Sequence, residues 1–284
     1  MLLLWLALAL AALILLYYAY AVEPRRWVVT EHDVRSPFVP PGFDGVRIVQ
    51  ISDTHISPFH PLRDFERLVD LVNGLAPDLC VFTGDLYDAR RKGWEGDPAV
   101  SPPLKRIQAP LGKFAVYGNH DFGLDRKTRT SGPLLEQGGF RVLINETCRI
   151  ERPGGGVLTV SGLDSYVRGQ PQPERALAGL PEDAFHLLLV HEPDAADELT
   201  AYPVDLQLSG HSHGGQVSLP LVGALVRTKY GRKYLGGSYV VANRPRPFRL
   251  YVSLGIGTTR LRLRLRCKPE IAVFTLRRES APAQ

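Results

Sequence analysis

Gly210-His211-Ser212-His213-Gly214-Gly215-Gln216 is the stretch around which this 284-residue sequence is organised, and it follows the short apolar run 204–208. Its two histidines lie two residues apart between glycines, which suggests imidazoles held toward one point. Taken alone, such a pair also fits an ordinary half-exposed strand, because side chains two residues apart share one face of a strand. The rest of the sequence decides between these two interpretations.

Four further polar motifs each follow an apolar run: Asp53-Thr54-His55, Gly84-Asp85, Gly118-Asn119-His120-Asp121, and His191. In open α/β folds, ligands gather just beyond the carboxyl ends of the strands. An ordinary strand does not explain why five such motifs all follow apolar runs. We therefore expect these side chains to converge on one site.

The segments between the motifs alternate in their hydrophobic period. A β-branched run at 46–51 is followed by helical spacing at 62–75, and further strands are predicted at 79–83, 113–117, 141–144 and 185–190. Short helices are expected near 104–108, 134–137 and 173–180, and a hairpin at 149–163 that turns at 153–156. This alternation predicts the α/β class.

Two other segments carry specific expectations. Residues 260–266 alternate strictly between Arg and Leu, which predicts a strand with one apolar and one basic face. The basic face would be either solvated or turned toward phosphates or lipid headgroups. Residues 88–110 are polar and rich in proline, and we expect a loop near the site that contributes to substrate choice.

The first 22 residues contain no charged side chain and, as a helix, would reach about 33 Å, enough to cross a bilayer. A cleavable signal peptide is the alternative, since Ala19-Tyr20-Ala21 has the form of a cleavage site. The length of the run and the absence of Lys or Arg before it favour an uncleaved anchor. Arg25 and Arg26 follow the run directly, which predicts an inner (cytoplasmic) membrane protein with a cytoplasmic catalytic domain.

The chain is thereby divided into a transmembrane anchor (1–22), a lead-in segment with an edge strand near 27–30 (23–45), one catalytic domain (46–277) and a flexible tail (278–284). A hydrophobic content of 44% is ample for a buried core. The three cysteines are far apart and indicate no disulfide framework. The net charge of +5 comes without a basic block interleaved with aromatics, so a membrane is expected as partner and nucleic acid is not.

The candidate metal ligands combine carboxylates, an amide oxygen and imidazoles: Asp53, His55, Asp85, Asn119, His191, His211 and His213. This mixture suits Mn, Fe or Zn better than Mg or Ca, which prefer oxygen ligands throughout. Seven ligands exceed what one ion with an open position takes from a protein. Two divalent ions are therefore expected, with Asp85 as the ligand that they share.

In this order, D-x-H, G-D, G-N-H-D, a lone His and G-H-x-H resemble the motifs of the calcineurin-like metallophosphoesterase superfamily. The resemblance implies an α/β fold built as a four-layer α-β-β-α sandwich of two mixed sheets. It assigns one ion to Asp53, His55 and His213, the other to Asn119, His191 and His211, and both to Asp85. Ions about 3.5–4 Å apart would clamp a phosphate and acidify a bridging water, whose hydroxide attacks phosphorus.

The same resemblance gives catalytic roles to two further residues. His120 would face the leaving group and donate a proton to it, and Asp88 would orient that imidazole. The alternative for His120 is a structural histidine behind the metal ligands. The alternative for Asp88 is a carboxylate that caps its loop.

The apolar amino terminus, the 210–216 stretch and the segment from 251–257 to 267–271 resemble a bacterial membrane-associated branch. That branch includes UDP-2,3-diacylglucosamine pyrophosphatases of lipid A synthesis and related phosphodiesterases. The resemblance implies hydrolysis of a phosphodiester or pyrophosphate, with a lipid-linked nucleotide such as UDP-2,3-diacylglucosamine as favoured substrate and Mn as favoured metal. A broad-specificity phosphodiesterase, a phosphoprotein phosphatase using Arg90 and Arg91, and a non-catalytic interaction module remain as alternatives.

Overall fold

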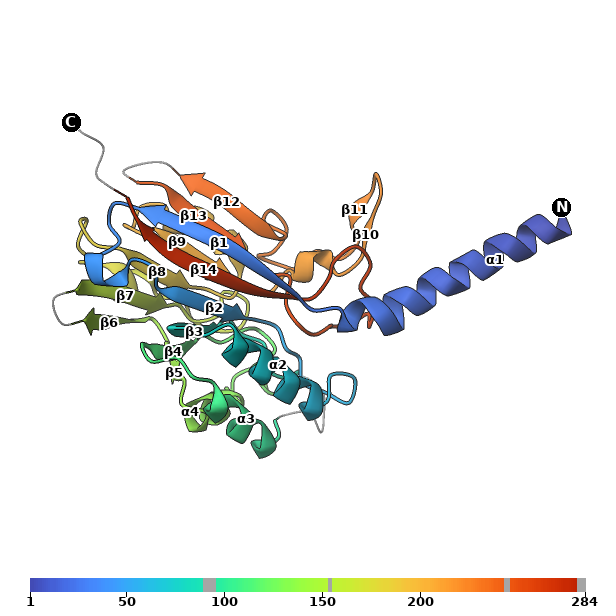
Figure 1. Cartoon of the computed structure of the whole chain (residues 1–284), viewed down its shortest axis with the longest axis horizontal. Coiled ribbons are helices and arrows are strands. Elements are labelled where there is room, and N and C mark those ends of the chain that lie inside the picture. Colours follow the sequence, from blue (N-terminus) through green and yellow to red (C-terminus); the bar gives the residue numbers. More distant parts are fainter. Residues whose placement is uncertain (89–95, 153–154, 243–245, 280–284) are drawn as a thin grey trace.

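The computed structural model of the chain describes residues 1–88, 96–152, 155–242 and 246–279. Two six-stranded sheets pack face to face, and the amino-terminal helix α1 (Leu2–Tyr17) projects from one end of them (Figure 1). The expected loop at 88–110 and the hairpin turn at 153–156 lie partly outside the described residues.

The first sheet has the order β1-β14-β2-β3-β4-β5. Strands β2 to β5 are parallel, β14 is antiparallel to β2, and β1 is parallel to β14. The strands of this sheet are β1 (Val28–Ser36), β2 (Arg47–Ile51), β3 (Leu79–Phe82), β4 (Gly112–Ala115), β5 (Arg141–Val142) and β14 (Glu270–Arg278).

The second sheet has the order β12-β13-β9-β8-β7-β6, with antiparallel pairs at its two edges and parallel pairs between them. Its strands are β6 (Glu146–Arg152), β7 (Gly156–Gly162), β8 (His186–Leu189), β9 (Leu206–Ser209), β12 (Gly237–Ala242) and β13 (Phe248–Val252). A separate two-stranded hairpin consists of β10 (Ser218–Leu219) and β11 (Gly223–Ala224).

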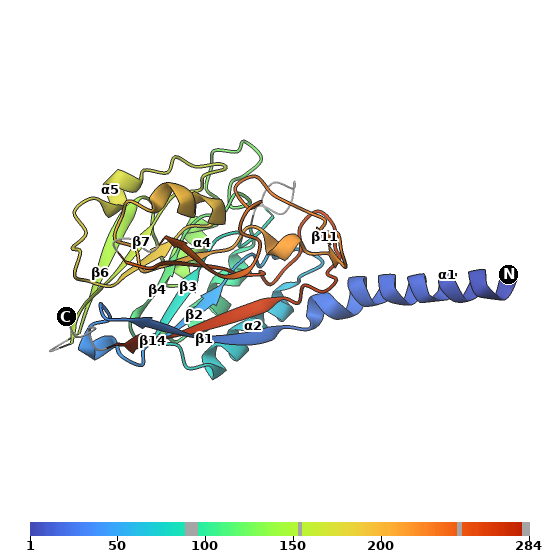
Figure 2. The same cartoon turned by 90° about the horizontal axis from the view of Figure 1, so that it is seen from above.

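Short helices cover the outer faces of both sheets. They are α2 (Leu62–Gly74), α3 (Ser101–Arg106), α4 (Gly132–Gln137) and α5 (Pro173–Leu177). Further 3₁₀ or π-helical segments lie at Tyr18–Val22, Glu23–Arg25, Pro41–Phe43, Pro98–Val100, Pro193–Leu199 and His213–Gly215. Figure 2 shows α5 and α2 on opposite sides of the two sheets.

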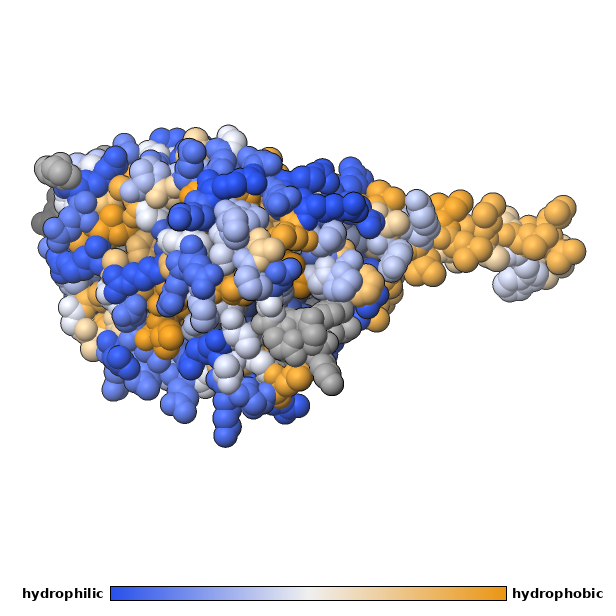
Figure 3. All heavy atoms as spheres, turned by 90° about the horizontal axis from the view of Figure 1, so that it is seen from below, coloured by the Kyte–Doolittle hydropathy of each residue, from blue (hydrophilic) through white to orange (hydrophobic). Residues whose placement is uncertain are grey.

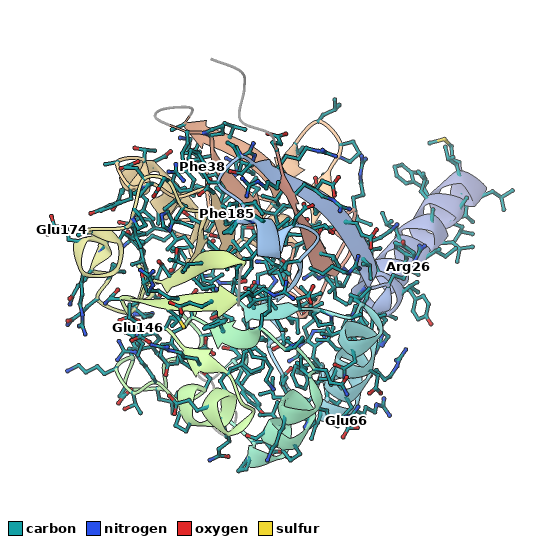
Figure 4. All side chains as sticks on the ribbon, turned by 60° about the vertical axis from the view of Figure 1, so that its left-hand side comes forward. Arg26, Phe38, Glu66, Glu146, Glu174 and Phe185 are labelled. Atoms are coloured by element: carbon teal, nitrogen blue, oxygen red, sulfur yellow. The ribbon has the colours of Figure 1, made fainter. Side chains whose placement is uncertain are left out.

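Three buried cores follow from the alternation of side chains along the strands. Ile48 points into the core between the sheets, whereas its neighbour Val49 packs toward α2, α3 and α4. Likewise Leu187 faces the core between the sheets and Leu188 the core beneath α5. Phe185, in the core between the sheets, is labelled in Figure 4. These three cores confirm the predicted four-layer α/β arrangement.

The prediction of a strand at 260–266 was wrong. Arg260 and Arg266 both have φ near +56°, and only Leu265 forms an isolated bridge, with Val217. Arg264 is fully buried, so the segment has no continuous basic face. The reason is that the Arg264 guanidinium satisfies backbone carbonyls of the surrounding loop, a tertiary requirement that overrides the alternating pattern.

The predicted edge strand of the lead-in segment is present but longer, because β1 runs alongside β14 over nine residue pairs. The start of the catalytic domain at residue 46 stays a prediction.

The apolar helix continues from α1 to Arg25, and Leu2–Arg25 is long and apolar enough to cross a membrane. Figure 3 shows its hydrophobic surface projecting from a largely hydrophilic domain. Its carboxyl end is tied to the domain by two hydrogen bonds. The Arg264 amide donates to the Ala19 carbonyl at 2.9 Å, and the Cys267 amide donates to Glu23 Oε1 at 2.6 Å.

Candidate metal centre

The predicted ligands follow the carboxyl ends of parallel strands in both sheets, which brings residues far apart in sequence to one edge. Asp53 and His55 follow β2, Asp85 follows β3, His191 follows β8, and the 210–216 stretch follows β9. All seven predicted ligands are buried. Five have φ between 43° and 70°: Asp53, His55, Asp85, His211 and His213. Such left-handed conformations are uncommon in residues other than glycine and cluster at functional sites.

Asp53, His55 and His213 form one cluster. The Nε2 atoms of the two histidines are 3.1 Å apart, and Asp53 Oδ1 is 3.2 Å from His213 Nε2. The carboxylate of Asp53 is held by the Ser52 hydroxyl at 2.5 Å and by the backbone amide of His211 at 3.1 Å. Its orientation is therefore fixed before any ligand binds.

His191 and His211 form a second pair whose tautomers are set by backbone carbonyls. His191 Nδ1 donates to the Thr83 carbonyl at 2.6 Å, and His211 Nε2 donates to the Lys229 carbonyl at 2.8 Å. In the neutral rings, the nitrogens left as acceptors are His191 Nε2 and His211 Nδ1. These two atoms face each other at 3.2 Å.

Asp85 lies between the two clusters. Its Oδ2 is 3.6 Å from His55 Nε2 and 3.3 Å from His191 Nε2, while its Oδ1 accepts a hydrogen bond from the His120 amide at 2.7 Å. The structure thus brings Asp85 to both clusters, as expected of a shared ligand.

The donor set fits divalent cations. Lone pairs that face one another in a buried site are unfavourable unless a proton or a cation lies between them. Besides the paired imidazoles, Asn119 Oδ1 and His55 Nδ1 are buried with no hydrogen-bond partner among the described residues. Metal-binding imidazoles in proteins are oriented by a hydrogen bond at their other nitrogen, as His191 and His211 are here.

The electrostatics of the site disfavour a bound proton at three of the ligands, His211, His55 and Asp53, but not at His191. Burial opposes charge on His191, but the neighbouring carboxylates of Asp85 and Asp53 raise its pKa well above the usual range. Burial, reinforced by His191, lowers the pKa of His211 to about 3. Burial and the neighbouring His120 lower the pKa of His55 well below its usual range. Burial opposes charge on Asp53, but His213, His191 and His55 together outweigh it and hold the pKa of that carboxyl below its usual range. Burial raises the pKa of Asp85 to about 7.

His120 and Asp88, the two predicted catalytic residues, are in direct contact. His120 Nδ1 lies 2.6 Å from Asp88 Oδ1, and the His120 ring meets the His55 ring edge-on at 4.7 Å between centroids. Both side chains are largely buried. This contact fixes the orientation of the His120 ring beside the metal cluster.

Sequence reasoning gave no role to Asp121, which organises the loops of the site. It is fully buried, and its carboxylate accepts hydrogen bonds from the amides of Gly118, Asp85 and Leu86 at 2.7–2.9 Å. The sequence signal that could have identified Asp121 is its position as the last residue of the G-N-H-D motif. Gly118 must remain a glycine, because a Cβ there would lie 2.2 Å from Asp85 Oδ1.

Two cavities adjoin the cluster and are lined by arginines. One is bounded by His55, Asp88, Arg260 and Arg262. The next, of about 430 Å³, shares Asp88 and Arg260 with it and adds Arg168. The mouth of the site is therefore suited to an anionic ligand. The sequence left the substrate-binding residues unassigned, although a phosphate-facing role was one of the two interpretations of the arginines at 260–266.

Comparisons with known proteins agree with this geometry. The Calcineurin-like phosphoesterase family matches residues 46–215. The metallophosphoesterase YkuE of Bacillus subtilis (strain 168) is 42% identical over 260 residues, which cover 92% of this chain and 89% of YkuE. Phosphodiesterase YaeI of Escherichia coli (strain K12) is 29% identical over 262 residues, 91% of this chain and 92% of its own.

A third relative is the UDP-2,3-diacylglucosamine pyrophosphatase LpxG of Chlamydia muridarum (strain MoPn / Nigg). It is 29% identical over 249 residues, which cover 72% of this chain and 74% of LpxG. With an extensive family match and buried Asp and His clusters suited to divalent ions, the chain belongs to the calcineurin-like phosphoesterases and is a metal-dependent phosphoester hydrolase.

Proposed function

We propose that this protein is a membrane-anchored hydrolase that uses two divalent ions to cleave a phosphodiester or pyrophosphate. The observation that carries the proposal is the convergence of acceptor atoms around Asp85, in contact with cavities lined by arginines. Asp53, His55 and His213 would hold one ion, Asn119, His191 and His211 the other, and Asp85 both. The mixed nitrogen and oxygen ligands favour Mn, with Fe or Zn as alternatives.

Divalent ions held there supply Lewis-acid polarisation of phosphoryl oxygens and a more acidic water as nucleophile. The chain's own residues do the rest. His120, in its protonated form, donates a proton to the departing oxygen, and Asp88, 2.6 Å from its Nδ1, orients the ring and stabilises that charge. Arginines at the mouth orient the phosphate by charge-assisted hydrogen bonds.

The favoured substrate is a lipid-linked nucleotide such as UDP-2,3-diacylglucosamine. Its support is the name of the LpxG relatives, at 28–29% identity, together with the apolar helix and the arginine-lined cavities. A broad-specificity phosphodiesterase is the second candidate, favoured by the YaeI relative. A phosphoprotein phosphatase is the third; Arg90 and Arg91, on which it depended, lie outside the described residues.

We also propose that the chain is anchored in the inner membrane with its domain in the cytoplasm. Arg25 and Arg26 lie at the carboxyl end of the apolar helix, and basic residues favour the cytoplasmic side. A reporter that is active in only one compartment, fused to the carboxyl terminus, tests this orientation. A periplasmic signal would contradict it and weaken the lipid-linked substrate.

The function is tested by hydrolysis assays with added Mn on three substrates: UDP-2,3-diacylglucosamine, a chromogenic phosphodiester and a phosphoserine peptide. Asp85→Ala and His120→Ala should both lose most activity. Asp33→Ala, which removes an exposed carboxylate on β1, is the control and should retain it. Undiminished activity in both site variants would refute the mechanism, and activity on the peptide alone would favour the phosphatase.

A further inference from the structure

A cavity of about 190 Å³ lies where the apolar helix meets the domain. The end of the helix and the residues after it contribute Tyr20, Arg25 and Trp27 to its wall. The opposite wall comes from the start of α2 and from the 258–262 loop. The cavity therefore opens at the level where a membrane-spanning helix would leave the bilayer.

We name this cavity the arginine pocket, since its wall carries Arg25, Arg63, Arg67 and Arg262 against one carboxylate, Asp64, among the described residues. Asp64 lies 3.9 Å from Arg63 and 4.0 Å from Arg67, at the limit of an ion pair. The side chains of these two arginines are 84% and 76% exposed. The pocket thus has an excess of positive charge that its own residues do not neutralise.

Aromatic rings set the positions of two of these guanidinium groups. Arg67 lies over the Trp27 ring at 5.7 Å from its centroid, and Arg262 stacks on Phe59. Stacking leaves the N–H groups at the edge of a guanidinium available, and these bind phosphate oxygens in pairs. His60, also in the wall, adds no charge at neutral pH, because burial lowers its pKa to about 4.

The arginine pocket adjoins a cavity at the metal centre. Phe59, Thr258 and Arg262 line both this pocket and the cavity that contacts His55 and Asp88. A phosphate group held in the arginine pocket would therefore lie close to a phosphorus atom at the metal centre. The two could belong to one ligand molecule or to two neighbouring ones.

The same end of the domain carries exposed apolar side chains. Leu221, Val222 and Leu225, at and beside the β10–β11 hairpin, are at least half exposed. Figures 1 and 2 both show this hairpin beside the base of α1. An apolar tip next to a spanning helix fits contact with a bilayer, which places the arginine pocket at the headgroup level.

We propose that the arginine pocket binds the phosphate-bearing headgroup of a lipid whose acyl chains stay in the bilayer beside α1, and that it presents this lipid to the metal centre. That the bound lipid is a substrate rests on the proposed function, whereas the binding itself does not. A free nucleotide reaches the metal centre from water, so its binding would not require a pocket whose wall includes the membrane helix.

The test uses the full chain in neutral detergent micelles, with W5F and W94F substitutions so that Trp27, which lines the pocket, is the single fluorescent tryptophan. Three ligands are titrated: dihexanoyl phosphatidate, inorganic phosphate and dihexanoyl phosphatidylcholine. We expect saturable binding of the phosphatidate, with the other two at least about tenfold weaker. Equal binding of inorganic phosphate and phosphatidate would overturn the proposal, since the pocket would then read a free phosphate.

A charge-matched pair of variants supplies the control. Arg63→Gln with Arg67→Gln should weaken phosphatidate binding about tenfold or more. Arg149→Gln with Arg175→Gln removes the same charge from exposed positions on β6 and α5 and should change it less than about twofold. Equal effects of the two pairs would contradict the proposal.

The binding assay is also run on Asp85→Asn, in which hydrolysis should be lost. Suppose that Asp85→Asn still binds phosphatidate and that the wild type hydrolyses none of the tested phosphoesters. The proposed function would then be refuted, whereas lipid binding by the arginine pocket would be supported. Hydrolysis in the wild type without phosphatidate binding would do the reverse.

Discussion

Arg264→Met is the substitution that most directly tests how the site is held. The guanidinium is fully buried and donates to the carbonyls of Gly257, Leu254, Gly255 and Cys267 at 2.6–3.2 Å. Methionine keeps much of the volume but no donor, so four carbonyl oxygens lose their charged partner. The Gly255 carbonyl keeps the Glu270 amide as a donor at 3.1 Å, so three carbonyls are left without a donor among the described residues. At about 1 kcal/mol for each unsatisfied acceptor, we expect a loss of about 3 kcal/mol in the free energy of unfolding.

For a domain of this size, such a loss lowers Tm by about 6–12 °C, at about 2–4 °C for each kcal/mol. Thermal unfolding of the metal-free full chain in detergent, followed by tryptophan fluorescence, measures it. Arg266→Met is the control, because it lies on the same loop but is exposed and should shift Tm by less than about 2 °C. If Arg264→Met shifted Tm no more than this control, the claim that hydrogen bonds from the Arg264 guanidinium stabilise the loop would be refuted.

Three further outcomes are expected. Gly210→Ala should lower the metal content of the purified protein, measured by elemental analysis, because the new Cβ would lie 2.0 Å from Ser52 Oγ and 2.2 Å from Asp53 Oδ2. A normal metal content would contradict this clash. Asp88→Asn should lower kcat about tenfold to a hundredfold with KM nearly unchanged, since the neutral amide no longer supports a proton on His120, and an unchanged kcat would argue against this role. Binding of Mn²⁺ to metal-free protein, measured by calorimetry, should weaken by at least about tenfold for each pH unit below 7, because Asp85, with a pKa of about 7, must lose its proton first; an affinity independent of pH would refute this.

Much of the fold was predictable because it rests on local patterns. The runs before Asp53 and Asp85 are β2 and β3, and the helical spacing at 62–75 is α2, all within one or two residues of the predicted bounds. Burial on both faces of these strands demands continuous apolar residues, and that demand is visible in sequence. The predicted ligands were likewise visible as polar residues directly after such runs.

The prediction failed where a tertiary contact outweighs the local pattern. Residues 260–266 alternate like a strand, yet the burial of Arg264 against loop carbonyls gives them an irregular path. The parallel pairing of β1 with β14 joins residues more than 230 positions apart, and no local pattern encodes it.

The sequence by itself determined which residue types could bind metal and the order in which the strands present them. Only the tertiary structure decided that His191 Nε2 and His211 Nδ1 face each other, since their tautomers depend on carbonyls contributed by Thr83 and Lys229. It alone also brought arginines from the end of the apolar helix, from α2 and from the 258–262 loop around one cavity. The physical reason is that spacing along the chain determines on which face of a strand or helix a side chain lies. Which lone pairs and charges meet depends instead on contacts between residues that are distant in sequence.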